Sequence, residues 1–275
     1  MTRQIETQED LVIPEFNTNK NVSVCTLASG SKGNSVYISN GSTSILIDAG
    51  FSGIEIEKRL KSKGLDPKNL DAIIVSHEHS DHIRGVGVLS RRFDIPVYIN
   101  RKTEQASIDL TGNIQKKNYF NCGVSFQINS MSIHPCSTPH DAAESACFTI
   151  SHENIKIGIA TDMGMATAMV KQHLKGCSLL ILEANHDLEM LTNGTYPWYL
   201  KQRIKSRTGH LSNVDAKNLL FDVAHNQLKH VILAHLSEEN NLPEKATRVV
   251  GEAITQYNIN LFSARQDRPS DIFHL

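Results

Sequence analysis

Residues 72–82 read AIIVSHEHSDH and place three histidines and an aspartate directly after a short apolar run. The run is rich in β-branched residues and too short for a helix, so it predicts a buried β-strand. In an extended segment alternate side chains project to the same side, which groups His77, His79 and Asp81. A turn into the next helix brings His82 back toward them. Imidazole and carboxylate without thiolate are typical ligands of Zn²⁺, Mn²⁺ or iron, and such close spacing favours a binuclear centre.

Short apolar runs and helical stretches alternate on both sides of these residues. The predicted strands are residues 22–27, 35–38, 44–48, 72–75, 97–99, 145–150, 155–160, 178–182 and 231–234. The predicted helices are residues 54–63, 82–92, 165–174 and 213–224. Because the two halves follow the same pattern and no linker divides them, we expect one α/β domain over residues 21–275. Its predicted architecture is a four-layer αββα sandwich with two mixed sheets flanked by helices. Residues 1–20 lack periodicity and are expected to form an N-terminal tail.

The composition is that of an ordinary globular protein. The chain has 275 residues, of which 40% are hydrophobic and 21% charged, and a formal net charge of -1. These values argue against disorder and against a strongly basic nucleic-acid-binding arm. No apolar run approaches the ~18–20 residues of a membrane span, and the polar N-terminus has no signal core, so we expect a cytoplasmic protein without a membrane partner. The five cysteines lack CxxC spacing, which favours reduced thiols over disulfides or a thiolate zinc site.

The HxHxDH motif of His77, His79, Asp81 and His82 resembles the signature of the metallo-β-lactamase fold superfamily. The resemblance extends to a lone histidine, an aspartate after a strand and a histidine near the C-terminus. It implies a metallo-β-lactamase sandwich with two divalent metal ions, Zn²⁺ or Mn²⁺. The implied ligands are His77, His79 and His140 for one ion, Asp81, His82 and His235 for the other, and Asp162 shared between them. Two such ions outweigh the charge of the two carboxylates and a hydroxide, which favours an anionic substrate such as a phosphodiester.

The C-terminal motifs, residues 209–213 (GHLSN) and 235–237 (HLS), resemble the tRNase Z and phosphodiesterase branch of the superfamily. In that branch the first histidine is a proton donor, a role that the resemblance implies for His210. Imidazole can protonate a departing alkoxide near neutral pH. The predicted catalytic residues are therefore His210 and Asp81, which would orient the nucleophile or take its proton.

Residues 27–35, 182–187 and 196–200 resemble the YycJ/WalJ family of bacterial metallohydrolases. This resemblance implies a nuclease, specifically a 5′ to 3′ DNA exonuclease, with nucleic acid as its partner and DNA favoured over RNA. The glycine-containing loop at 29–35 fits phosphate binding, because its backbone N–H groups and polar side chains can approach an anion. The predicted substrate-binding residues are Ser29, Ser31, Asn34 and His186. The less regular segment 188–207 contains cations that could also face phosphate.

Two other functions remain open from the sequence. The same ligands serve hydrolases of small esters, such as thioesters, lactones or cyclic nucleotides, although the HLS element argues against this class. The protein could also bind metal and a partner without turnover. One relative is excluded, because the interval from Asp162 to His235 leaves no room for the additional domain of β-CASP nucleases.

Overall fold

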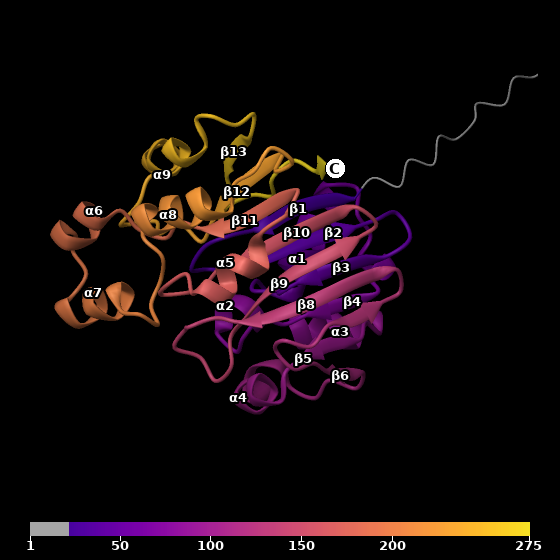
Figure 1. Cartoon of the computed structure of the whole chain (residues 1–275). Coiled ribbons are helices and arrows are strands. Elements are labelled where there is room, and N and C mark those ends of the chain that lie inside the picture. The colour runs from indigo at the N-terminus through magenta and orange to yellow at the C-terminus, as the bar shows by residue number, and fades with distance from the viewer. Residues whose placement is uncertain (1–21) are drawn as a thin grey trace, which may run out of the picture.

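Two seven-stranded sheets face each other and carry helices on their outer faces (Figure 1). The computed structural model describes residues 22–275, and the predicted tail at 1–20 lies outside the described residues. Within the described part, no helix is both long and apolar enough to cross a membrane. The α/β four-layer sandwich predicted from the sequence is confirmed.

The first sheet has the strand order β14-β1-β2-β3-β4-β5-β6. Strands β14 and β1 to β3 pair in antiparallel fashion, and β3 to β6 pair in parallel. The bounds are Ser23–Ala28 for β1, Ser35–Ser39 for β2, Ser44–Ile47 for β3, Ala72–Ile74 for β4, Val97–Ile99 for β5, Lys117–Tyr119 for β6 and Phe273–His274 for β14.

The second sheet has the strand order β13-β12-β11-β10-β9-β8-β7. Here β10 to β13 are parallel, and β7 to β10 are antiparallel. The bounds are Phe126–Ile128 for β7, Met131–Ser137 for β8, Ala146–His152 for β9, Ile155–Ala160 for β10, Leu179–Glu183 for β11, His230–Ala234 for β12 and Asn260–Ser263 for β13.

The central strands of each sheet are buried on both faces, which explains why they read as continuous apolar runs. In the first sheet Ala72 and Ile74 face the core between the sheets, while Ile73 and Val75 face the core beneath the helices. A third core lies between the second sheet and its helices. The helices are α1 (Gly53–Ser62), α2 (Ser80–Ile83), α3 (Val86–Phe93), α4 (Arg101–Thr111), α5 (Ala168–Leu174), α6 (Leu188–Asn193), α7 (Trp198–Lys205), α8 (Asn213–Val223) and α9 (Pro243–Gly251), with 3₁₀ turns at Pro67–Asn69 and Glu252–Ile254.

All nine predicted strands are present, with ends shifted by up to two residues, but one helix differs. The helix predicted over 82–92 is divided into α2 and α3. The break lies at Gly85, whose N–H donates to the Ala49 carbonyl at 2.8 Å and which leaves no room for a side chain beside the Phe51 carbonyl. Tertiary packing therefore overrides the helical pattern. The irregular segment 188–207 contains two short helices, α6 and α7.

The parallel strands bring their carboxyl ends to one edge of each sheet. Five polar residues lie at the ends of β3, β4, β10, β11 and β12 or within three residues after them, namely Asp48, His77, Asp162, Glu183 and His235. Ligand sites in α/β sheets form at this edge, because the strands support the loops there. The fold thus gathers polar side chains from both halves of the chain.

Gly50 lets two of these loops touch. A Cβ atom on Gly50 would lie 1.7 Å from the backbone oxygen of Asp81. Gly50→Ala is therefore expected to lower the free energy of unfolding by about 1–3 kcal/mol or more, because the loops must separate. Urea unfolding measures this loss. The control is Gly251→Ala, where the new methyl meets only Leu261 at 3.5 Å. Equal midpoints for the two variants would contradict the expectation.

Candidate metal centre

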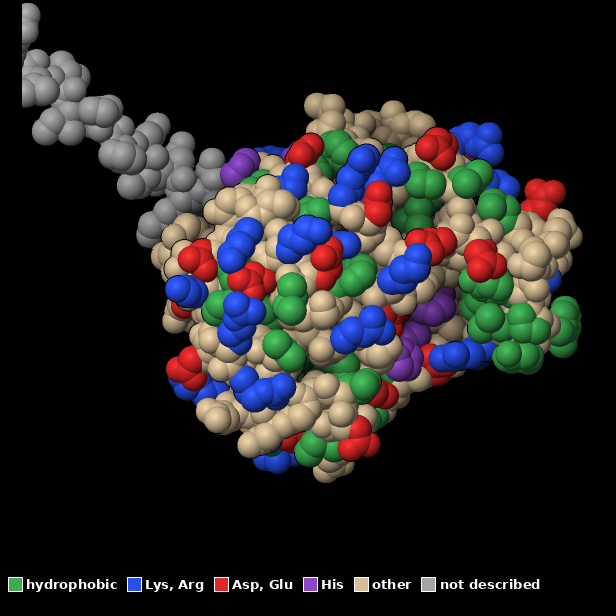
Figure 2. Space-filling model, turned by 180° about the vertical axis from the view of Figure 1, so that it is seen from behind, with side chains coloured by type: hydrophobic (Ala, Val, Ile, Leu, Met, Phe, Trp, Pro, Cys, Tyr) green, Lys and Arg blue, Asp and Glu red, His purple; other side chains and the backbone are tan. Residues whose placement is uncertain are grey.

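An open cleft of about 370 Å³ lies where the strand ends of the two sheets meet. Its lining includes His79 from the loop after β4, Asp81 from α2, Asp162 from the loop after β10, and His235 from the loop after β12. Figure 2 shows histidine side chains inside this hollow. His77, His82 and His140 are buried directly beneath it. Every residue predicted to bind metal is thus brought to one place.

Three imidazole nitrogens form a first group of donors. Nε2 of His77 lies 3.1 Å from Nδ1 of His79, which in turn lies 3.3 Å from Nε2 of His140. The three rings come from the β4–α2 loop and from the loop after β8. Their donor atoms converge on one point from two segments far apart in the sequence.

A second group joins Asp81, His82 and His235. Oδ2 of Asp81 lies 3.5 Å from Nε2 of His82 and 3.5 Å from Nε2 of His235. Asn34 donates from Nδ2 to the same Asp81 oxygen at 3.1 Å and so holds the carboxylate in place.

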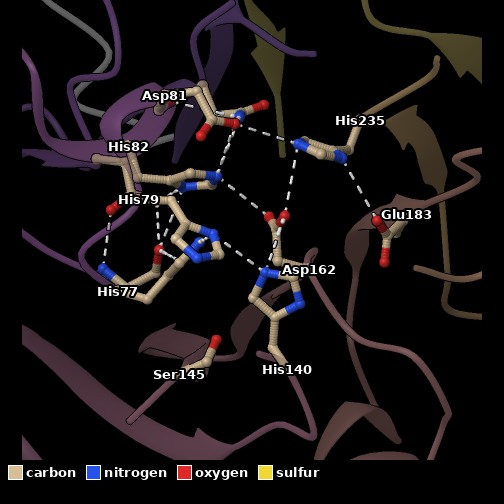
Figure 3. Close-up of polar contacts among 12 residues, drawn as sticks. His77, His79, Asp81, His82, His140, Ser145, Asp162, Glu183 and His235 are labelled. Atoms are coloured by element: carbon tan, nitrogen blue, oxygen red, sulfur yellow. Dashed lines mark hydrogen bonds and ion pairs between the residues drawn. The ribbon is translucent and has the colours of Figure 1, made fainter. Parts of the chain in front are cut away.

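Asp162 lies between the two groups (Figure 3). Its Oδ2 is 3.2 Å from Nε2 of His82, and its Oδ1 is 3.4 Å from Nε2 of His235 and 3.9 Å from Nε2 of His140. Oδ2 is buried and makes no hydrogen bond within the described residues. A carboxylate in this position can be shared by two cations.

Asp48 orients two of the imidazoles. The Ser76 hydroxyl donates to Oδ2 of Asp48 at 2.7 Å and therefore accepts from Nδ1 of His77 at 2.9 Å. His82 donates from Nδ1 to the same carboxylate at 2.7 Å. Because both Nδ1 atoms carry protons, Nε2 of each ring is the atom left to bind a cation.

Backbone and carboxylate oxygens orient two further rings. His140 donates from Nδ1 to the Gly209 carbonyl at 3.2 Å, and Nδ1 of His235 lies 3.4 Å from Oε1 of Glu183. Both contacts turn Nε2 toward Asp162. Outer partners of this kind are typical of histidines that bind metal.

Three of the strand ends adopt left-handed backbone conformations. Asp48, Asp162 and His235 have φ values of 61°, 57° and 56°. Non-glycine residues rarely adopt this region, and those that do are concentrated at functional sites. The turn immediately after each strand directs its side chain into the centre.

The centre is strongly negative and lacks a compensating Lys or Arg. Within residues 22–275, the ion pairs of the buried Asp48, Asp162 and Glu183 are all with histidines. Burial alone would raise the pKa of Asp162, but the imidazoles of His235 and His82 hold that pKa well below its usual range. Burial alone would lower the pKa of His82, yet Asp162 and Asp48 raise it well above its ordinary value. The carboxylates of the site therefore stabilise positive charge that is placed between them.

Divalent metal ions fit these residues. Tetrahedral ligands about 2.0–2.1 Å from one zinc ion lie roughly 3.3 Å from each other, close to the separations within each group. Burial and the neighbouring His82 lower the pKa of His77 well below its ordinary value, which keeps its imidazole neutral. Neutral imidazole is the form that binds metal.

His210 lies beside the donors, on the cleft side. Its Nδ1 donates to Oε1 of Glu183 at 2.7 Å, and its ring centroid is 5.0 Å from that of His235. Burial would raise the pKa of Glu183, but His210 and His235 lower it to about 2. The ionised Glu183 therefore fixes the His210 ring and leaves Nε2 available in the cleft.

The residues predicted to bind substrate occupy different positions. Of the four, Ser31 lines the cleft. Ser29 is buried, and its hydroxyl accepts from the His235 N–H at 2.7 Å. Asn34 is also buried, and it accepts from the Gly30 N–H and donates to Asp81. Ser29 and Asn34 thus hold centre residues in place, while the role of each in substrate binding stays a prediction.

His186 is buried behind the cleft wall and is near Glu183 and His210. Its side chain is 2% exposed and does not line the cleft. Burial lowers its pKa to about 4, so the ring is neutral at physiological pH. Its backbone carbonyl accepts from the Asn213 N–H at the start of α8. The predicted contact of His186 with substrate has no support from this position.

Sequence reasoning assigned no role to Asp48 or Glu183. Each follows or ends a buried apolar strand, Ile45–Ile47 for Asp48 and Leu179–Leu182 for Glu183. The same signal, an acidic residue at the end of such a run, accompanies Asp162. A search of the sequence for acidic residues at or just after apolar strands would have indicated all three carboxylates as candidate site residues.

Comparison with known proteins identifies the family. The model of the metallo-beta-lactamase superfamily matches residues 28–120. Exodeoxyribonuclease YycJ of Bacillus anthracis is 38% identical over 247 residues, which cover 89% of this chain and 94% of the relative. Exodeoxyribonuclease WalJ of Streptococcus pneumoniae is 36% identical over 239 residues, or 86% of this chain and 89% of the relative.

Solved structures share the fold. YhfI of Bacillus subtilis, a metallo-beta-lactamase fold protein, superimposes with a TM-score of 0.74 at 16% identity over 93% of this chain and 100% of its own. The short form of human tRNase Z has a TM-score of 0.63 at 16% identity over 90% of this chain and 98% of its own. With the sequence relatives and the histidine and aspartate groups described above, these findings show that the chain belongs to the YycJ/WalJ family of the metallo-β-lactamase superfamily and is a metal-dependent hydrolase.

Proposed function

We propose that the chain is a binuclear phosphodiesterase that degrades nucleic acid as a 5′ to 3′ DNA exonuclease, in the cytoplasm. The observation that carries the proposal is the position of Asp162 between two groups of donors at the floor of an open cleft. The names of the YycJ and WalJ relatives, both exodeoxyribonucleases, support DNA as the substrate.

Seven residues would hold two divalent ions, Zn²⁺ or Mn²⁺, namely His77, His79, Asp81, His82, His140, Asp162 and His235. Bound there, the ions would supply positive charge that polarises a phosphodiester and favours ionisation of water. Asp81 would orient the attacking water or take its proton. Its Oδ2, held by Asn34, lies at the cleft surface.

His210 would protonate the leaving oxygen. Its Nδ1–H donates a hydrogen bond to Glu183, and the residue lines the cleft. The proton for transfer to the leaving oxygen would therefore come from Nε2. General acid catalysis of this kind is typically worth ~10²–10⁴ in rate. Glu183 would act as a positioning residue that keeps this ring in place.

Measured metal content tests whether His140 is a metal ligand. His134, which lies six residues earlier in β8, serves for comparison. His140→Ala is expected to lower the bound metal from two ions toward one and to reduce turnover at least 100-fold, because one ligand is lost. His134→Ala is the matched control, since its Nδ1 instead contacts the Ser125 hydroxyl at 2.7 Å. Elemental analysis of dialysed proteins measures the content. Two ions retained in His140→Ala would contradict the assignment.

The leaving group tests the role of His210. His210→Ala is expected to slow cleavage of an oligonucleotide ~10²–10⁴-fold. The loss on bis(p-nitrophenyl) phosphate should be much smaller, because nitrophenolate departs without a proton. Glu183→Gln should show the same selectivity to a lesser degree. Steady-state kinetics at matched metal content measure both substrates, and equal losses on both would argue against a proton donor.

Direction and substrate are tested with labelled oligonucleotides. Single- and double-stranded DNA with a 5′ phosphate, labelled at either end, should be shortened stepwise from the 5′ end, whereas an RNA control should be cut more slowly. The metal-reconstituted wild-type chain is compared with His77→Ala. Stepwise release from the 3′ end would reject the polarity. If the metallated chain hydrolysed only thioesters or lactones, the phosphodiesterase proposal would fail.

A further inference from the structure

The segment from Leu188 to Lys205, here called the arm, projects from the sandwich (Figure 1). It contains α6 and α7, and α7 has no buried residue. Both Trp198 and Tyr199 are 74% exposed. Figure 2 shows hydrophobic side chains gathered on this projecting part, next to the hollow that contains the histidines.

The arm forms one wall of the cleft. Tyr196, Leu200, Arg203 and Ile204 all line it. Tyr199 lies one helical turn before Arg203, so the two side chains share a face of α7. The arm thus carries aromatic and apolar residues on the cleft wall, such as Tyr196 and Leu200, and exposed rings next to them in the sequence, Trp198 and Tyr199.

The arm is anchored at both ends to the sandwich, to α9 at one end and beside the centre at the other. Lys245 pairs with Asp187 at 2.8 Å just before α6, and Lys201 donates to the Gly194 carbonyl at 2.6 Å, which ties α7 to α6. At the other end Arg203 pairs with Asp141, and the His210 N–H donates to the Ile204 carbonyl at 3.0 Å. The exposed rings are thus held at a defined place relative to the centre.

The charge of the arm favours an anionic occupant. The arm has three cations, Lys201, Arg203 and Lys205, against one acidic residue, Glu189, and Arg207 follows two residues after it. Exposed aromatic rings beside cations are the combination that binds single-stranded nucleic acid, since bases stack on the rings while the cations attract the backbone. A duplex offers no free base faces to such rings.

We propose that the arm binds the single-stranded end of the nucleic acid that enters the cleft, with bases stacked on Tyr199 and Trp198. The inference rests on the proposed function and adds a substrate form: a strand whose terminal nucleotides are unpaired. Stacking would hold the strand beyond the bond that is cut, so the rings act in binding and not in the chemical step.

Kinetics on two substrates test the proposal with the full-length metallated protein. Trp198→Ala/Tyr199→Ala should lower kcat/KM on single-stranded oligothymidylate about tenfold or more relative to kcat/KM on bis(p-nitrophenyl) phosphate, mainly through KM. Phe221→Ala is the matched control, because Phe221 is 65% exposed on α8 and does not line the cleft. In Phe221→Ala the ratio of kcat/KM on oligothymidylate to kcat/KM on bis(p-nitrophenyl) phosphate should equal that of the wild-type chain.

A binding measurement checks the contact directly. Trp198 is the only tryptophan in the chain, so intrinsic tryptophan fluorescence reports on the arm alone. Oligothymidylate should quench this fluorescence in His210→Ala, which binds but turns over slowly. An oligomer of abasic linkers, with phosphates but no bases, should quench it far less.

Three results would overturn the inference. Equal quenching by the abasic oligomer would show that phosphates alone are bound. An unchanged ratio in the double variant, with wild-type activity on DNA intact, would remove the arm from substrate binding while leaving the proposed function standing. The wild-type chain could also be a dimer that becomes monomeric in the double variant while that ratio stays unchanged. This result would show that the rings bind a second copy of the chain and not nucleic acid. If the wild-type chain does not cleave DNA at all, the proposed function itself fails.

Discussion

The structure depends on three buried carboxylates that pair with histidines and, within residues 22–275, with no Lys or Arg. Asp48, Asp162 and Glu183 are each at most 5% exposed, and within the described residues their ion pairs are with imidazoles. Buried charge is costly unless it is compensated, and the raised pKa values of His82 and His235 show that these carboxylates favour positive charge beside them. Divalent ions answer this requirement, and the convergence of the histidine nitrogens shows where they would lie.

The three carboxylates lie at different positions in the centre, and each contacts different side chains. Asp48 lies beneath the centre and fixes the tautomers of His77 and His82 through direct contacts and the Ser76 hydroxyl. Asp162 lies in the middle and faces both donor groups. Glu183 lies to one side and orients His210 toward the cleft. The parallel strands make this possible, because their ends deliver each carboxylate to the same edge.

The sequence was most informative where chemistry and local pattern coincide. The strand at 72–75 and the alternation of His77, His79 and Asp81 followed from periodicity alone. His140, Asp162 and His235 could be joined to that motif only through a family resemblance, since nothing local reveals contacts between distant segments. Asp48 was not assigned a role because its contacts with Ser76 and His82 join segments that are distant in the sequence.

The same limit applies to helices. The break between α2 and α3 arises from the approach of Gly85 to the Phe51 turn, a contact that no helical pattern contains. The arm was difficult to predict because α7 buries no residue and therefore has no apolar stripe. The sequence pattern suggested phosphate contacts for the cations of this segment but assigned no role to its aromatic residues, which the structure places on the arm beside the cleft.

A crystal structure of the protein loaded with Mn²⁺ or Zn²⁺, with anomalous data collected at the edge of each metal, tests the central claim most directly. We expect two anomalous peaks, one among His77, His79 and His140 and one among Asp81, His82 and His235, with Asp162 in contact with both. A single peak away from Asp162, or no peak in protein whose metal content has been measured, would contradict the account.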